Sequence, residues 1–402
     1  MSFDPHDVRE DIPLLQDDEP PIYVDNACMT LKPDPVIEEL NRYYEQTPVC
    51  AGRSTYRLAG EVDEAVQRSR ATVASFLGAD SADECVFTRN TTEAMNLAAK
   101  GLDLPTGSTV LTSDREHNSG LVPAQRLAEG GVHHEAVGST EQGAFDLEAY
   151  KARMEEGDVS LVSLVHMSNL DGYITPMQAV AEIAHDHDAL VLADGAQSAP
   201  HVPVDVAELG VDLFAFSVHK AMGPTGVGVL WGRAEILDEM DPLVAGGATI
   251  ESTTLTDHEL LDAPGRFEAG LQDFAGIQAT HAALTYLEEM DRAAVSDHEE
   301  KLSRRLQEGI EALGCDVYGA PEAKGNGIVS FAMDGLDIHD LAVVLEDEAD
   351  VCVRAGLHCL DSWFNARGLG GSCRASLYAY NTMHEVETIL DTLAEIRTAV
   401  AG

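Results

Sequence analysis

The chain has 402 residues, and its 70 Asp and Glu against 25 Lys and Arg give a formal net charge of −45 at pH 7. A hydrophobic content of 45% excludes a disordered chain and is enough for a large core, most readily divided over two domains. The acidic excess excludes nucleic acid and anionic membranes as partners, because both need clustered Lys and Arg.

The acidic residues are spread along the chain, as in VREDIPLLQDDEP and LEDEAD, and do not form a tail. Concentrated salt screens the mutual repulsion of such a surface. We therefore hypothesise a halophilic protein from a salt-loaded cytoplasm, and full activity without added salt would argue against it. The charged N-terminus, the lack of a long apolar run and seven cysteines without a CxxC pair predict a cytoplasmic protein with free thiols.

The first part of the chain predicts helices at 33–46 and 61–78, where apolar residues recur at three- and four-residue steps. Short apolar runs follow, with a helical segment at 177–188 between the second and the third. Because these runs are rich in Val and Leu without polar alternation, they suit buried strands of a parallel sheet. The runs are 108–113, 159–169, 189–197, 211–220 and 226–232.

Near residue 275 the pattern changes to long helices at 276–290 and 297–314. The last part predicts strands of a smaller sheet at 315–319, 327–333 and 351–356, with a helix at 337–348. The fold class is therefore α/β, with a larger doubly wound domain and a smaller α+β domain. We assign residues 20–280 to the large domain, and residues 1–19 with 281–402 to the small one.

Polar residues follow the ends of four predicted strands. Asp194 and Lys220 come after two of them, and His117 and Asn169 after two others. Ligands of an open parallel sheet bind beyond the carboxyl ends of its strands. Spacing alone favours a simple salt bridge between Asp194 and Lys220. However, Lys220 is one of only six lysines and lies between an apolar strand and a glycine-rich turn, where burial would make its amine nucleophilic.

A second signal is the start of the helix that follows FTRN. Asn90 occupies an N-cap position with Glu93 three residues later, as in a capping box. Thr91 and Thr92 then offer hydroxyl and N–H groups at the positive end of the helix. Many helices begin in this way, so the pattern is a weak indication of an anion site.

Strand-end Asp, Lys and His with a helix-start anion site together describe a site for pyridoxal 5′-phosphate (PLP). The segments YVDNACMTLKP, FTRNTTEAMNLAA, HMSNLDGYITP, LADGAQSAPHVPVDV, FSVHKAMGPTGVGVLWG and CRASLYAYNT occur in this order. In these segments the chain resembles the class V aminotransferase-like enzymes of fold type I, and among them the SufS-type cysteine desulfurases. The resemblance covers almost the whole chain.

The resemblance implies a role for each matching residue. Lys220 would carry the cofactor and move the substrate Cα proton, Asp194 would pair with the pyridinium nitrogen, and Gln197 would bind the ring hydroxyl. His117 would stack on the ring and assist proton transfer. The groups holding the phosphate would be Thr91, Thr92, Ser217 and His219, and those binding the substrate carboxylate would be Asn169 and Arg374.

Two cysteines lie near that arginine, and the resemblance assigns them different roles. Cys359 matches the persulfide-forming cysteine of the GxHC motif of the family. Cys373 directly precedes Arg374 in a segment that predicts a strand. Because adjacent strand residues point to opposite faces, Cys373 is expected to face the core if Arg374 faces the site.

Several positions depart from the family pattern. Cys28 stands where alanine is usual, and near Cys50 and Arg53 both histidines of the family motif are missing. Leu271 replaces a threonine that would reach a neighbouring subunit's phosphate, and the loop after Cys359 is unusual. Cys28 and Cys50 could relay sulfur or bind a metal, but packing is the favoured interpretation. Cys85, Cys315 and Cys352 are expected in the core, the HDHD segment at 185–188 on a surface helix, and no metal site is predicted.

The sequence thus predicts a PLP-dependent cysteine desulfurase that converts L-cysteine to L-alanine and leaves a persulfide on Cys359. The sulfur would pass to an acceptor protein of iron–sulfur assembly or another thiolation pathway, and the family implies a homodimer. The alternatives are a selenocysteine lyase, another class V lyase or aminotransferase, and a non-catalytic scaffold.

Overall fold

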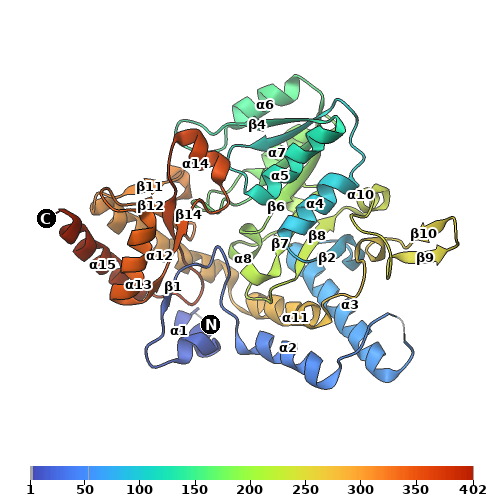
Figure 1. Cartoon of the computed structure of the whole chain (residues 1–402), viewed down its shortest axis with the longest axis horizontal. Helices are drawn as coiled ribbons and strands as arrows, with labels where there is room; N and C mark the ends of the chain where they lie inside the picture. The colour runs from blue at the N-terminus through green and yellow to red at the C-terminus, as the bar shows by residue number, and fades with distance from the viewer. Residues whose placement is uncertain (1–2, 53, 402) are drawn as a thin grey trace.

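The computed structural model describes residues 3–52 and 54–401, which build two main sheets of different size and two small two-stranded ones, with helices around them (Figure 1). The larger sheet has seven strands in the order β2-β8-β7-β6-β5-β3-β4. Parallel pairing joins β7 to β6, β6 to β5, β5 to β3 and β3 to β4. The bounds along the sheet are Cys85–Thr88, Gly228–Gly232, Leu213–Ser217, Leu190–Asp194, Val159–Val165, Thr109–Ser113 and His133–Val137.

The prediction of parallel pairing is wrong for the run at 226–232. This strand, β8, is antiparallel to both of its neighbours, β7 and β2. Only ten residues, 218–227, separate β7 from β8, and most of them form a 3-10 turn and a glycine-rich loop. A parallel crossover needs a dozen or more residues, so the chain turns back.

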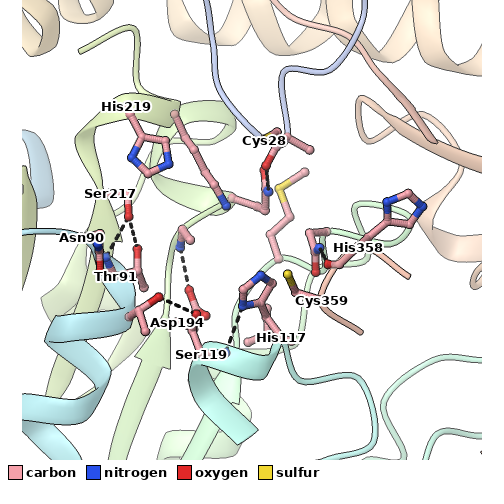
Figure 2. A pocket seen from close by; sticks show the side chains of 18 of the residues that line it. Cys28, Asn90, Thr91, His117, Ser119, Asp194, Ser217, His219, His358 and Cys359 are labelled. Atoms are coloured by element: carbon pink, nitrogen blue, oxygen red, sulfur yellow. Dashed lines mark hydrogen bonds between the residues drawn. The ribbon is translucent and has the colours of Figure 1, made fainter. Parts of the chain in front are cut away.

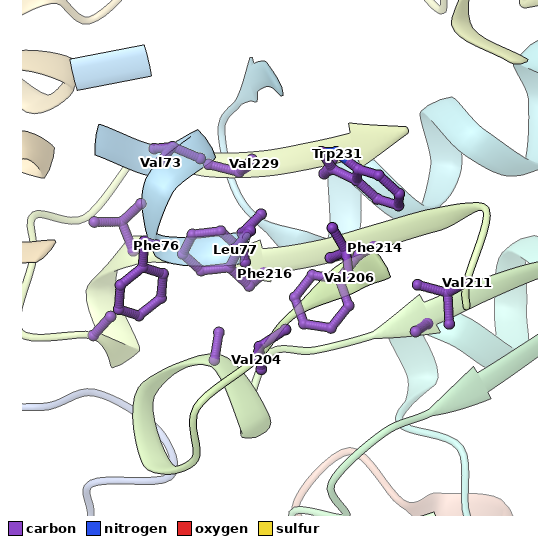
Figure 3. Close-up of a cluster of buried hydrophobic side chains, with 14 of the residues drawn as sticks. Val73, Phe76, Leu77, Val204, Val206, Val211, Phe214, Phe216, Val229 and Trp231 are labelled. Carbon is purple, nitrogen blue, oxygen red and sulfur yellow. The ribbon is translucent and has the colours of Figure 1, made fainter. Parts of the chain in front are cut away.

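Two apolar layers cover the faces of the larger sheet. Phe214 and Phe216 of β7 belong to one cluster of buried side chains, and Leu213 and Ala215 belong to another, as strand alternation requires (Figure 3). The first layer also contains Phe76 of α3. The helices of this part are α2 (Asp34–Gln46), α3 (Arg57–Leu77), α4 (Thr91–Gly101), α5 (Asn118–Leu127), α6 (Leu147–Glu155), α7 (Met177–His185), α8 (Ser198–His201), α9 (Val206–Leu209), α10 (Ala234–Glu239) and α11 (Phe274–Glu289).

The smaller sheet is antiparallel, with the order β11-β12-β15-β14. Its strands are β11 (Asp316–Tyr318), β12 (Ile328–Ala332), β15 (Ser372–Ser376) and β14 (Arg354–Gly356). A separate apolar cluster lies against it. The helices that follow or flank these strands are α12 (Arg292–Ala312), α13 (Ile338–Ala349), α14 (Asp361–Arg367) and α15 (Met383–Ala401).

The sequence predicts that the run at 351–356 is one strand of this sheet, and this prediction is wrong. Its first half, β13 (Val351–Cys352), pairs in parallel with β1 (Ile22–Tyr23), and only its second half, β14, joins β15. Cys352 is consequently half-buried, whereas Cys85 and Cys315 are buried as expected.

The N-terminal segment contacts both parts of the molecule. Val8 of α1 (Pro5–Glu10), Ile12 and Leu15 belong to the cluster that lies on the larger sheet, while β1 pairs with β13. The division at residues 20 and 280 stays a prediction. A separate hairpin, β9 (Ile250–Thr253) with β10 (His258–Leu260), projects from the end of the molecule that lies away from the smaller sheet (Figure 1). No helix of the described residues combines the length and apolarity needed to cross a bilayer.

Candidate active site

The predicted site residues of the large sheet meet where β6 and β7 end. Asp194 is the last residue of β6, and Lys220 ends the 3-10 turn η4 (Val218–Lys220) that follows β7. Because β6 and β7 are parallel neighbours, their carboxyl ends lie at one edge of the sheet. A pocket of about 250 Å³ opens there (Figure 2). All predicted site residues line it: Thr91, Thr92, His117, Asn169, Asp194, Gln197, Ser217, His219, Lys220, Cys359 and Arg374.

Burial shifts both central charges toward their neutral forms. It lowers the pKa of the Lys220 ammonium and raises the pKa of the Asp194 carboxyl, and each group partly offsets the shift of the other. One Asp194 oxygen accepts from the Ala196 N–H at 2.9 Å. In the described part of the chain the two side chains form no ion pair, so the simple salt bridge that spacing favours is not what the structure contains. Lys220 is left with its amine facing the pocket.

His117 supplies a neutral imidazole to the same pocket. Its Nδ1 accepts from the Ser119 N–H at 3.0 Å, which leaves the proton on Nε2. Burial, assisted by the charges of Lys220 and Arg374, lowers the pKa of His117 to about 3. At neutral pH this ring therefore offers an uncharged face and a donor.

The start of α4 forms a polar cradle beside these groups. The Asn90 side chain accepts from the Glu93 N–H at 3.0 Å, which confirms the N-cap. Ser217 Oγ accepts from the Thr91 N–H at 2.8 Å and lies 2.6 Å from Thr91 Oγ1, so the helix start is tied to the end of β7. This approach depends on Gly228 of β8, where a Cβ would stand 2.5 Å from the Asn90 Cα.

Arg374 forms the opposite wall of the pocket. It lies on β15 with 2% of its surface exposed, and its guanidinium donates to the Asn169 carbonyl at 3.1 Å and to Asp25 at 3.2 Å. Asn169 in turn donates to the His358 carbonyl at 2.8 Å. Within the described residues, Arg374 Nε and Asn169 Oδ1 are buried without a partner. The unpaired Nε–H of Arg374 suits a carboxylate of a bound amino acid.

Cys359 lies in the loop between β14 and α14, with its thiol exposed at the pocket. The backbone of His358 and Cys359 is left-handed, with φ of 53° and 59°, which is uncommon for residues other than glycine. Asn118 at the start of α5 fastens this loop: its N–H donates to the Cys359 carbonyl and its side chain to Asp361, both at 2.8 Å.

Cys373 has the opposite environment. It is fully buried in the cluster of the smaller sheet, and its thiol donates to the Ile338 carbonyl at 3.0 Å. The alternation argument is therefore confirmed, since Arg374 faces the pocket and Cys373 the core.

One pocket residue, Arg354, was not identified from the sequence. It lies opposite Arg374 on the neighbouring strand. Cys28, for which packing is the favoured interpretation, also lines the pocket, and its sulfur accepts from Arg354 at 2.9 Å. Glu116, next to His117 in the chain, is buried without lining the pocket, and burial raises its pKa to about 8. Arg354 gives no local signal in the sequence, because its place in the pocket depends on pairing between distant segments.

The remaining residues of interest lie away from the pocket. Cys50 is exposed and does not line it, and Arg53 lies outside the described residues. Leu271 is 73% exposed in the loop before α11. His185 of the HDHD segment is 3.0 Å from Asp212, and the segment forms a solvated helix end as expected.

The pocket residues fit PLP. Asp194 is a buried carboxylate beside a pocket, which is costly unless a cation such as a pyridinium meets it. Gln197 Oε1 is buried without a partner among the described residues, and its position suits the ring hydroxyl. The hydroxyls and N–H groups at the start of α4 suit a phosphate, and the amine of Lys220 has the lowered pKa that covalent attachment requires.

Comparisons with known proteins agree with this geometry. Residues 22–389 match the aminotransferase class-V family. A protein of Halobacterium salinarum named "Probable cysteine desulfurase" is 38% identical, over 98% of this chain and 97% of its own, and the "Cysteine desulfurase" of Haloferax volcanii is 35% identical over 98% and 97%. The chain therefore belongs to the aminotransferase class-V family, whose membership implies PLP.

Solved structures place it more narrowly, beside cysteine desulfurases. The apo cysteine desulfurase of Thermococcus onnurineus NA1 has a TM-score of 0.94 at 37% identity, over 99% of this chain and 100% of that one. The cysteine desulfurase CsdA of Escherichia coli has a TM-score of 0.92 at 28% identity, with both chains fully covered. The predicted fold type I is thus confirmed.

Proposed function

We propose that the protein is a PLP-dependent cysteine desulfurase in which Lys220, Asp194 and Arg374 prepare L-cysteine and Cys359 takes its sulfur. One observation carries the proposal: a half-buried lysine with a lowered pKa, a buried arginine and an exposed thiol line the same pocket. Curated relatives named as cysteine desulfurases, similar over nearly their whole length, support it.

Within this proposal, Lys220 attaches the cofactor, and Asp194 and Gln197 hold its ring. The phosphate is held at the start of α4 and at the end of β7, by Thr91, Thr92, Ser217 and His219. When bound, PLP acts as an electron sink that makes the Cα proton of an amino acid acidic. Burial lowers the pKa of His219 to about 4, so it contributes a neutral hydrogen-bonding ring.

Arg374 and Asn169 orient the substrate through its carboxylate. A planar guanidinium can bind both carboxylate oxygens, and Arg374 is already fixed by Asn169 and Asp25. The Lys220 amine, whose pKa burial lowers, then removes the Cα proton and returns a proton later. The neutral ring of His117 lies in position to support this transfer.

Cys359 completes the reaction. Its thiolate attacks the Sγ of the bound cysteine, an S–S bond forms, and the Cβ–Sγ bond breaks. The electron pair of the broken bond stays with the substrate carbon, which takes up a proton and leaves as the methyl group of L-alanine. The persulfide remains on an exposed residue, where a thiol of an acceptor protein can collect it. We propose an acceptor of iron–sulfur assembly or another thiolation pathway, and a homodimer.

A substrate test with one pair of variants checks the proposal. The protein purified with PLP should show visible absorbance and form equal amounts of alanine and persulfide from L-cysteine. Cys359→Ala should lose the persulfide and keep the absorbance, whereas Cys373→Ala should keep both. A colourless protein that takes up no PLP would favour a scaffold, and a preference for L-selenocysteine would favour a lyase.

A further inference from the structure

The pocket contains two thiols that come from opposite ends of the chain. Cys28 lies in the segment after β1, Cys359 lies in the loop after β14, and both line the pocket (Figure 2). The other cysteines do not line it: they are Cys50, Cys85, Cys315, Cys352 and Cys373. Cys28 is therefore the only thiol of the described residues that shares the pocket with Cys359.

Arg354 connects the two thiols electrostatically. Its guanidinium donates to Cys28 Sγ at 2.9 Å, and the nearby Cys28 and Cys359 both raise the pKa of Arg354. A guanidinium has donors only, so the Cys28 sulfur is the acceptor in this contact. The nucleophilic form of a cysteine is its thiolate, and Arg354 places a guanidinium directly against the Cys28 sulfur. Asp25 lies 3.6 Å from Arg354 and keeps the guanidinium in place.

Both thiols are also close to the Lys220 amine. Cys28 and Cys359 each partly offset the lowering of the Lys220 pKa by burial, and Cys28 does the same for the pKa of Arg374. Cys28 is half-buried, whereas Cys359 is exposed. One thiol of the pair is thus open to a protein partner, and the other is sheltered inside the site.

Resting on the proposed function, in which Cys359 carries the persulfide, we propose that Cys28 takes the outer sulfur from Cys359 and stores it as a second persulfide. The Cys28 thiolate attacks the outer sulfur, and a new S–S bond forms to Cys28. The S–S bond to Cys359 breaks, and its electron pair remains on Cys359 as a thiolate. The step consumes no oxidant, reductant or further reactant.

A persulfide extends the reach of Cys359 by about 2 Å, the length of one S–S bond, into the pocket that Cys28 also lines. Once the sulfur has moved, Cys359 can react with another substrate molecule. Each chain would then hold two sulfane sulfurs, one exposed and one sheltered.

The test locates the sulfur on the protein with PLP bound. After incubation with L-cysteine and no added thiol, alkylation and peptide mass spectrometry should find sulfur on Cys359 first and on Cys28 later. The total should approach about two sulfurs per chain. Cys28→Ala and Cys28→Ser should each halve it and leave the sulfur on Cys359, while Cys50→Ala, which removes an exposed thiol away from the pocket, should leave it unchanged.

Two outcomes would overturn the storage role and leave the proposed function intact. The first is a wild-type protein that carries sulfur on Cys359 alone. The second is a Cys28–Cys359 disulfide with release of sulfide, which means attack on the inner sulfur. A persulfide on Cys28 in Cys359→Ala would mean direct reaction of Cys28 with substrate, and it would overturn both the storage role and the assignment of Cys359. A wild-type protein without persulfide on any cysteine would instead contradict the proposed function.

Discussion

The two walls of the pocket are built in different ways. On the wall formed by the larger sheet, Asp194 and Ser217 are the last residues of buried parallel strands, and a strand pair fixes their separation. On the other wall, Cys359 lies in a loop with left-handed backbone and an exposed thiol. A group that positions a ring benefits from the rigidity of strand ends, whereas a group that passes sulfur to a partner has to be accessible.

The largest expected difference is in the rate of alkylation, between the loop thiol of Cys359 and the strand thiols of Cys373 and Cys85. Burial raises the pKa of Cys373 and of Cys85 to about 12, so at pH 8 only about one in ten thousand of either is a thiolate. Iodoacetamide at pH 8 should therefore modify the exposed Cys359 and spare Cys373 and Cys85 until the protein unfolds. Peptide mass spectrometry with and without denaturant measures this, and early labelling of Cys373 would contradict the contrast.

Lys220→Ala should stop the chemistry on the strand-built wall. Proton transfer by a positioned side chain contributes on the order of a thousandfold in rate, and in the proposed function this lysine also attaches the cofactor. Alanine formation from L-cysteine should fall by at least that factor, and the absorbance of bound PLP should shift. Lys151→Ala, which removes an exposed lysine of α6, is the matched control and should change neither. Retained alanine formation in Lys220→Ala would refute the assignment.

Arg374→Lys should impair binding more than chemistry. Lysine keeps the charge but lacks the planar fork, and it also loses the contacts with Asn169 and Asp25. We expect KM for L-cysteine to rise by roughly ten- to a hundredfold, since truncating a buried charged pair costs about 2 kcal/mol or more. Steady-state kinetics would show it, and an unchanged KM with a reduced kcat would place Arg374 in a different role.

Glu116→Gln should have the smallest effect on activity, because Glu116 does not line the pocket, and should change the pH dependence of stability instead. Because burial raises the pKa of Glu116 to about 8, its contribution to stability is complete below the unfolded pKa of 4.5 and is lost as pH rises through 8. The loss amounts to about 1.4 kcal/mol per pH unit in this window. The variant should therefore show a flatter decline of melting temperature between pH 5 and 8 than wild type, or than Glu141→Gln at an exposed site. Parallel curves would contradict the buried, protonated state.

The parts of the site that could be predicted from the sequence are those with local signals. Asp194 and Lys220 follow apolar runs, the N-cap of α4 is visible in FTRNTTE, and the two faces of β15 follow from alternation. The resemblance to a known family supplied the roles. The antiparallel course of β8 could have been expected from the short connection before it, but its Val- and Leu-rich run looks the same in either direction.

The parts that escaped prediction depend on contacts between distant segments. Arg354 and Cys28 become neighbours only because β1 pairs with β13. The run at 351–356 gives no sign that its two halves join different sheets. Periodicity reports the face of an element, and it says nothing about which remote segment covers that face.

The closure of the pocket by the N-terminal segment has a consequence for biosynthesis. Ala27 donates to Ser376 Oγ across 349 residues of chain, and β1 has no strand partner until β13 has been made. Contacts of such high sequence separation form late, because a long loop has to close first. We therefore expect the larger sheet to fold while the ribosome is still adding residues, and the binding site to become complete only after β13 and β15 have left the ribosome.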